Sequence, residues 1–302
     1  MTVTLHHGEA VEVLPRYSGQ AALIYMDSLF GTGRTFRTRS GEVAFEDRFA
    51  PGAFRPYLEE LIAGSFEALA PHGALWIHCS VGFQPLAREI ADRVFAAAPR
   101  GGFEDQVIWN YRRWTVAGRR CNQVHDYLLR YVRDRELARW TQLYQPLAES
   151  TRATWGTKKQ KAMVRDGVRR RSISTDEESR GAPLGDVWSD IGVIAPSARE
   201  RTGFPTQKPE KLLSRLVAIS SLPGDLVLDP TCGAASMLVA AQRLGRDAVG
   251  IDRSEVAIRF ARERLAQFEN ELALSPRRAT ETAHRRSLAG PRRHFPQKGN
   301  VE

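Results

Sequence analysis

The most constraining feature of the chain is a strand, loop, helix and strand pattern, LVLDPTCGAASMLVAAQRLGRDAVGID, at residues 226–252. An apolar run ends at Asp229, small residues follow, a helical pattern extends to Gly245, and a second apolar run ends at Asp252. In a doubly wound sheet such a loop lets a ligand approach the backbone, and the second acid can accept hydrogen bonds from ribose hydroxyls. The pattern therefore favours a site for a nucleoside-type cofactor over a βαβ unit that only packs.

Strand and helix patterns of the same kind occupy both ends of the chain. Residues 21–26 and 73–79 have the composition of buried strands, and residues 54–69 between them place apolar side chains at helical spacing. We expect further helices at 83–98, 209–221, 236–244 and 254–265, and further strands within 103–114, 123–134, 225–229 and 247–252. A chain of 302 residues can form one such α/β core with a mostly parallel sheet and an inserted lobe, followed by a disordered tail after about residue 268.

Positive charge is concentrated in two segments of the chain. The net charge is +9, with eight Lys or Arg and one acid in residues 152–171, and seven and one in residues 276–298. Basic residues gathered in this way are typical of a surface that binds a polyanion, although a solvated loop and a disordered tail have the same composition. Trp109, Tyr111 and the arginines that follow them fit either a base-stacking surface or an edge strand with solvated arginines.

No segment is typical of a leader or a membrane span. The N-terminus lacks a basic segment followed by an apolar one, and no run approaches 18 apolar residues, so we expect a cytoplasmic protein associated with the nucleoid. Cys79, Cys121 and Cys232 are too far apart for a disulfide framework or a four-cysteine zinc site, and we expect buried thiols. His78 and His125 lie in apolar strands as structural residues, so no metal site is predicted.

Two stretches resemble motifs of the β-class DNA amino-methyltransferases. In that family a Pro-Thr-Gln-Lys-Pro helix start precedes an Asp-Pro-Phe-x-Gly-x-Gly-Thr loop, and PTQKP is intact at residues 205–209, ahead of DPTCGAAS at 229–236. VHDYLLRYV at 124–132 resembles the His-Asp strand of the family. ALIYMDSLFGTGR at 22–34 stands in the place of the Asp-Pro-Pro-Tyr/Phe signature, without its prolines. The resemblance covers roughly residues 3–138 and 185–266.

The resemblance implies a Rossmann-like fold that transfers a methyl group from S-adenosyl-L-methionine (AdoMet) to the exocyclic amine (N6) of a flipped-out adenine in DNA. Asp27 and the carbonyl of Ser28 would accept the two N–H groups of the amine, and Phe30 would stack on the base. The AdoMet pocket would be formed by Asp229, Pro230, Gly233, Asp252, Thr206 and Lys208.

Two positions depart from the motifs of the family. Ser28 and Leu29 replace two prolines, and we expect the looser backbone to slow the reaction about tenfold. Ala235 replaces a glycine of the AdoMet loop, and its methyl group would clash with the cofactor unless the φ of Ala235 is negative.

Three functions stay open. Adenine is preferred because an aspartate leads the four-residue motif; a cytosine-N4 enzyme and a DNA-binding paralogue that has lost catalysis are the alternatives. A cytosine ring-carbon methyltransferase is disfavoured, because its thiol nucleophile typically follows proline and the chain has no Pro-Cys pair.

The resemblance also implies a division of the chain and a partner. We expect a catalytic half over 1–139, a loop-rich target-recognition lobe over 140–187, an AdoMet half over 188–267 and a basic tail over 268–302. Double-stranded DNA is the expected partner, and a homodimer stays open because dimers are frequent in this family. The residues expected to contact DNA are Lys158, Lys159, Lys161, Arg169, Arg170, Arg171, Arg112 and Arg113.

Overall fold

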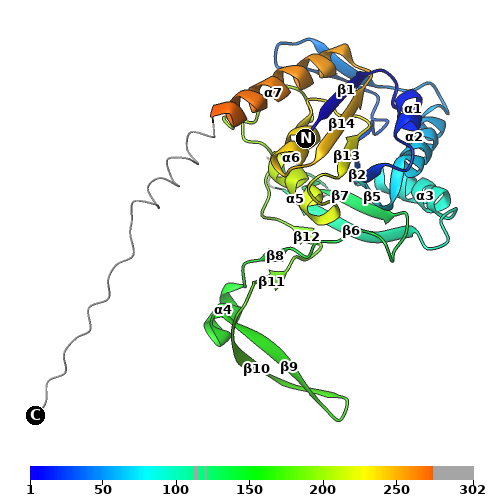
Figure 1. Ribbon diagram of the computed structural model, residues 1–302. Coiled ribbons are helices and arrows are strands. Elements are labelled where there is room, and N and C mark those ends of the chain that lie inside the picture. Colours follow the sequence, from blue (N-terminus) through cyan, green and yellow to red (C-terminus); the bar gives the residue numbers. More distant parts are fainter. Residues whose placement is uncertain (112–114, 120, 275–302) are drawn as a thin grey trace, which may run out of the picture.

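An eight-stranded sheet forms the core of the protein (Figure 1). The structure is a computed structural model and describes residues 1–111, 115–119 and 121–274. The strand order is β1-β14-β13-β2-β5-β7-β6-β12, in which β7 runs antiparallel to both of its neighbours and every other pair is parallel. The prediction of a mostly parallel α/β sheet is therefore confirmed.

The strands of this sheet are β1 (Val3–His7), β2 (Ala21–Met26), β5 (Leu69–Cys79), β6 (Gly102–Asn110), β7 (His125–Val132), β12 (Val187–Trp188), β13 (Leu226–Asp229) and β14 (Asp247–Asp252). Because β2, β13 and β14 are parallel neighbours, their carboxyl ends lie at one edge of the sheet. Asp27, Asp229 and Asp252 stand at or directly after those ends. The topology thus gathers three carboxylates at one edge.

Helices cover both faces of the sheet. On one face lie α1 (Ala10–Val13), η1 (Leu14–Tyr17), α2 (Phe54–Ala68) and α3 (Gln84–Phe95); on the other lie α5 (Glu210–Ser220), α6 (Ser236–Arg243) and α7 (Glu255–Leu274) (Figure 1). Strand β2 shows why both faces must be covered. Leu23 and Tyr25 pack into the cluster of α5, α6 and α7, whereas Ile24 and Met26 pack against α2 and α3.

Several expectations from the sequence need correction. Helix α7 continues to Leu274, so the expected disordered tail does not begin near residue 268. Trp109 and Tyr111 are buried in the core, which is inconsistent with a base-stacking surface; the Nε1 of Trp109 donates to the carbonyl of Ile191 over 2.8 Å. Cys121 is exposed, whereas Cys79 and Cys232 are buried as expected.

The lobe expected to be rich in loops contains a long antiparallel hairpin instead. Strands β9 (Lys158–Arg165) and β10 (Val168–Glu178) pair with each other and project away from the core as an arm (Figure 1). Helix α4 (Glu149–Trp155) and the short pair β8 (Tyr144–Gln145) and β11 (Ala182–Pro183) form its base. Asp166 and Gly167 both have positive φ at the turn, as a tight hairpin turn requires, and this Asp-Gly pair is the signal in the sequence that predicts a hairpin.

A second, shorter hairpin is also absent from the predicted elements. Its strands β3 (Arg34–Arg37) and β4 (Val43–Asp47) follow the loop after β2. This hairpin brings Asp47 beside that loop. In the part of the chain that the structure describes, no helix is long and apolar enough to cross a membrane.

Candidate active site

A cavity of about 640 Å³ opens where β2, β13 and β14 end. Every residue predicted from the sequence to bind the cofactor or the target amine lines it. The loop after β2 contributes Asp27, Ser28 and Phe30; the loop after β13 contributes Asp229, Pro230 and Gly233; β14 and the turn before α5 contribute Asp252, Thr206 and Lys208. Their assembly at one place follows from the parallel order of the three strands.

The loop after β2 presents one acid and one aromatic ring to the cavity. The Nζ of Lys208 donates to the Asp27 carboxylate, and both side chains are largely buried. The ring of Phe30 stacks on Phe83 with centroids 5.0 Å apart and an interplanar angle of 24°. The ammonium group of Lys208 is therefore directed at Asp27, and its contact with the cofactor remains a prediction.

The loop after β13 is held to the end of β14 by the Asp252 carboxylate. Its two oxygens accept the N–H groups of Gly233 and Ser254 over 2.9 and 2.8 Å. Gly233 has φ +50°, and a Cβ atom there would lie 3.2 Å from the ring of Phe204. The loop thus keeps its backbone open to the cavity, as a cofactor that approaches the main chain requires.

Burial raises the pKa of two carboxyl groups of this cavity, Asp229 and Asp252. Burial raises the pKa of Asp229 well above its usual value, and the nearby charges of Asp27 and Asp252 add to the effect, although the N–H of Thr231 opposes it. Burial also raises the pKa of Asp252, against the N–H groups of Ser254 and Gly233. A cationic ligand would relieve this cost, because an opposite charge favours the ionised acids.

The pKa of Asp229 leads to a prediction for stability. An acid whose pKa is higher in the folded state keeps its proton while the unfolded chain loses it, so stability falls as pH rises from about 4 through the folded pKa. Asp229→Asn has no such proton. Without ligand, the free energy of unfolding of this variant minus that of the wild type should therefore increase from pH 5 to pH 8. Urea unfolding measures both. Equal differences at the two pH values would contradict the assignment.

Ala235 does not obstruct the cavity. The φ of Ala235 is +59°, whereas we expected that only a negative φ would keep the methyl group away from the cofactor. The residue occupies the left-handed region, at a strain of about 1 kcal/mol. Ala235 is nevertheless fully buried in the apolar cluster of α5, α6 and α7, while its neighbours Ala234 and Ser236 line the cavity. The methyl group therefore packs into the core and leaves the cavity wall free.

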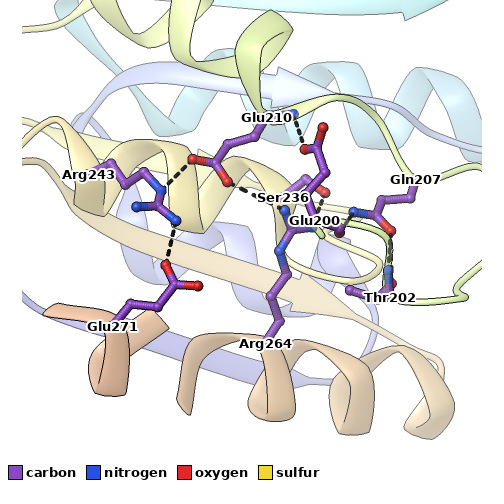
Figure 2. A network of polar contacts seen from close by, with 8 residues as sticks. All are labelled: Glu200, Thr202, Gln207, Glu210, Ser236, Arg243, Arg264 and Glu271. Atoms are coloured by element: carbon purple, nitrogen blue, oxygen red, sulfur yellow. Dashed lines mark hydrogen bonds and ion pairs between the residues drawn. The ribbon is translucent and has the colours of Figure 1, made fainter. Parts of the chain in front are cut away.

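A polar network behind the cavity ties three helices together (Figure 2). Arg264 of α7, buried among apolar residues, donates to the hydroxyl of Ser236 and pairs with Glu210, the first residues of α6 and α5. The backbone N–H of Glu210 in turn donates to the Glu200 carboxylate over 2.8 Å. Because the loop after β13 and the turn with Lys208 directly precede α6 and α5, the network fixes both walls of the cavity relative to each other.

A buried hydrogen-bonded chain extends from the cavity into the sheet. The hydroxyl of Tyr25 lies 2.8 Å from Nδ1 of His78, whose Nε2 lies 3.1 Å from the Asp126 carboxylate. Burial raises the pKa of Asp126, but the hydrogen bond from His78 and the charge of Lys208 outweigh it and lower the pKa overall. His78 is thus the hydrogen-bonded structural residue that was expected, and in the described residues no group of His, Cys, Asp and Glu could hold a metal ion.

The sequence places this site in a known family. The family model described as DNA methylase (N6_N4_Mtase) matches residues 21–263, which is most of the chain. The chain belongs to the DNA methylase family. The match covers the three strand ends that carry Asp27, Asp229 and Asp252, and it includes the hairpin arm.

Two curated relatives are similar to this chain over most of its length. M.EcaI, a type II methyltransferase of Enterobacter cloacae, is 27% identical over 82% of this chain and 65% of its own, so the chain spans less than two thirds of it. YhdJ, a DNA adenine methyltransferase of Escherichia coli (strain K12), is 26% identical over 94% of this chain and 91% of its own.

Two solved structures share the fold of the methylase. The M1.HpyAVI–SAM complex has a TM-score of 0.55 at 19% identity, over 87% of this chain and 99% of its own. The PvuII cytosine-N4-specific DNA methyltransferase has a TM-score of 0.57 at 11% identity, over 87% and 86% of the two chains. At these identities the similarity concerns the fold, which is the Rossmann-like methyltransferase fold expected from the sequence.

The hairpin arm carries some of the cations predicted to contact DNA. Lys158 and Lys159 pair with Glu178 and Glu177 over 2.6 and 2.7 Å, so acids of the arm balance these two lysines. Lys161 has no such partner in the described part of the chain. Arg112 and Arg113, and the side chains of Arg169, Arg170 and Arg171, lie outside the described residues.

Proposed function

We propose that this DNA methylase transfers a methyl group from AdoMet to the exocyclic amine of adenine (N6) in a base flipped out of double-stranded DNA. One observation carries the proposal. The acid and the aromatic ring suited to a nucleobase amine, Asp27 and Phe30, line the same cavity as the acids suited to a nucleoside cofactor, Asp229 and Asp252. Donor and acceptor of the methyl group would thus meet in one site.

The residues around the loop after β13 fit AdoMet. When bound, AdoMet supplies an electrophilic methyl group on a positively charged sulfur. Asp252 has two lone-pair sites left on its oxygens after accepting two N–H groups, so it would accept hydrogen bonds from the ribose. The hydroxyl of Thr231, buried without a partner among the described residues, is a further candidate contact in the same loop. The carboxylate of Asp229 would interact favourably with the positive charge of the cofactor.

The residues of the loop after β2 would prepare the amine. The lone pair of an exocyclic amine is delocalised into the ring, so the amine is a weak nucleophile. Asp27 and the carbonyl of Ser28 would accept its two N–H protons, localise the lone pair and stabilise the positive charge that develops on nitrogen. Phe30 would stack on the base, which must leave the duplex to reach the cavity. Asp27 would also take up the proton that the amine loses after transfer.

Lys208 has a distinct place in this cycle. In the structure its ammonium group donates to the Asp27 carboxylate. An incoming amine would hydrogen-bond to the same carboxylate, so Lys208 would either move away from Asp27 or stay bound to it together with the amine. Lys208 would therefore pair the buried charge of Asp27 when no amine is bound to it.

The arm is the proposed DNA contact. An isolated two-stranded ribbon has marginal stability in water, and this one exposes Met163, Val164, Val168 and Ile173 as well as its cations. The major groove of DNA accepts a two-stranded ribbon. Lys161 and Arg165 would bind phosphate groups beside the groove. Neither has an acid partner among the described residues.

The arm gives a prediction for the salt dependence of DNA binding. Lys161→Ala together with Arg165→Ala should weaken binding similarly for all sequences and flatten the slope of log K against log salt by about 1 for each lost contact. Fluorescence anisotropy with duplex DNA at several salt concentrations measures the slope. Arg16→Ala with Arg262→Ala removes the same charge from exposed positions of the core. If both pairs of substitutions flatten the slope equally, net charge rather than the arm is responsible.

The proposed reaction is tested by identifying the product. Purified protein is incubated with labelled AdoMet and DNA that contains all short sequences, and the DNA is digested to nucleosides and analysed by mass. N6-methyladenine supports the proposal. N4-methylcytosine would establish the cytosine-N4 alternative instead. If no methylated base exceeds the background of Asp27→Ala, the chain is a DNA-binding paralogue without catalysis.

A further inference from the structure

The buried acid Asp47 lies beside the cavity but belongs to none of the predicted sites. It ends β4 and is only 2% exposed. Its Oδ1 accepts the N–H of Gly31 over 2.8 Å, and its Oδ2 accepts the N–H and the hydroxyl of Thr32 over 2.9 and 2.6 Å. In the described part of the chain no Lys, Arg or His forms an ion pair with it. Its two carboxyl oxygens are therefore satisfied by hydrogen bonds from the loop that follows Phe30.

The backbone of β4 strengthens the same attachment. The N–H of Gly33 donates to the carbonyl of Asp47 over 2.8 Å, and Nε of Arg48 donates to the carbonyl of Gly33 over 2.9 Å. Gly31 has φ +68°, and a Cβ atom there would lie 3.0 Å from the ring of Phe54. Residues 31–33 are thus fixed one after another, in a backbone conformation that glycine adopts most easily.

The backbone between Asp27 and Gly31 has few restraints of its own, although the Ser28 hydroxyl donates to the carbonyl of Leu29 over 3.2 Å and the Phe30 ring stacks on Phe83. No hydrogen bond in the described structure uses the backbone N–H of Ser28 or Leu29. These are the two positions at which the resembled signature has prolines, whose rings would restrict the backbone. The chain between Asp27 and Gly31 is therefore held at its ends, by β2 before it and by Asp47 after it.

We infer that Asp47 is the positioning residue of the amine-binding loop. It fixes the Ser28 carbonyl and the Phe30 ring by anchoring Gly31 and Thr32, and so supplies the order that two prolines would otherwise give. The inference rests on the proposed function of that loop. A carboxylate suits the task because it accepts all three donors at two oxygens, whereas an asparagine would turn its NH₂ group toward one of the N–H groups.

Asp47→Asn tests the inference, with Glu46→Gln, an exposed neighbour on the same strand, as the matched control. For Asp47→Asn we expect kcat to fall on the order of 10- to 100-fold, because a displaced carbonyl and ring no longer meet the amine. The Kd of AdoMet, measured by calorimetry, should change less than about threefold, which also shows that the variant folds. Hydrogen exchange at residues 31–32 should accelerate. Glu46→Gln should match the wild type in all three.

A rescue experiment separates positioning from a general structural role. Adding Ser28→Pro and Leu29→Pro to Asp47→Asn should restore kcat by about tenfold, because prolines limit the loop directly. They remove no backbone N–H hydrogen bond, only the one from the Ser28 hydroxyl to the carbonyl of Leu29. Exchange at residues 31–32 should stay fast, since the acceptors are still missing.

Three outcomes would overturn the inference: kcat of Asp47→Asn within twofold of the wild type, no gain from the prolines, or unchanged exchange at residues 31–32. If the wild type itself methylates no DNA, the proposed function fails, while the exchange measurement still tests whether Asp47 anchors the loop. If Asp47→Asn does not fold, Thr32→Val removes one of the three donors and should give a smaller loss of kcat and a smaller rise in exchange. An unchanged Thr32→Val would then reject the anchor.

Discussion

Asp27→Asn should reduce methyl transfer on the order of 10³-fold while the protein still binds AdoMet. The substitution keeps the size of the side chain but turns an acceptor into a group that also donates, so the amine loses both its partner and the negative charge that stabilises its developing positive charge. Single-turnover transfer with saturating AdoMet and DNA measures the chemical step. A rate within tenfold of the wild type would remove Asp27 from the reaction.

The ion pair with Lys208 requires a control, because Asp27→Asn also leaves that ammonium group unpaired in a buried place. Lys208→Met breaks the same pair but leaves both oxygens of Asp27 free to accept the amine. Its loss of rate should be at least tenfold smaller than that of Asp27→Asn. Equal losses would mean that Asp27 acts mainly as the partner of Lys208.

Asp252→Ala should weaken AdoMet binding on the order of 100-fold. The substitution removes the proposed ribose acceptor and leaves the N–H groups of Gly233 and Ser254 without their partner, so the loop after β13 loses its attachment to β14. Calorimetric titration of the protein without DNA gives the Kd directly. Circular dichroism confirms that the variant is folded.

The opposite end of the same strand provides the control. Asp247 begins β14, is partly exposed, and accepts a hydrogen bond from the N–H of Thr2. Asp247→Ala should leave the Kd of AdoMet within about twofold of the wild type, because this end of the sheet faces away from the cavity. If both variants bind AdoMet equally, the loss reflects the general stability of the strand rather than a contact with the cofactor.

The sequence predicted the location of the cavity because its signals are local. Asp229 and Asp252 each end an apolar run, and the parallel topology that follows from βαβ units brings such ends together without any knowledge of side-chain contacts. Glycine and small residues after β13 predicted an open loop for the same reason. The roles assigned to Asp27, Ser28 and Phe30 depend on the family resemblance and stay predictions.

Features set by distant contacts could not be read from the sequence. Asp47 is the last residue of the short strand β4, and only the folded hairpin brings it to Gly31. The direction of the Ala235 methyl group depends on how α6 packs, so the sign of its φ did not decide whether the cavity stays open. The indole of Trp109 can be buried because its Nε1 donates to the carbonyl of Ile191, a residue far along the chain. The hairpin arm is the exception, because its Asp-Gly pair is a local sequence signal for a hairpin turn. The surrounding polar composition favours a loop instead, and the local signal was the better guide.

The acidic wall of the cavity has a consequence for turnover. Six acids and two cations line the cavity that AdoMet would fill: Glu9, Asp27, Asp47, Glu60, Asp229 and Asp252, against Lys208 and Arg253. Loss of the methyl group turns the sulfonium into a neutral thioether, so the spent cofactor has one positive charge fewer to offset those acids. The acids of this wall would attract the fresh cofactor more strongly than the spent one, so each reaction would weaken the electrostatic attachment of the molecule that must leave.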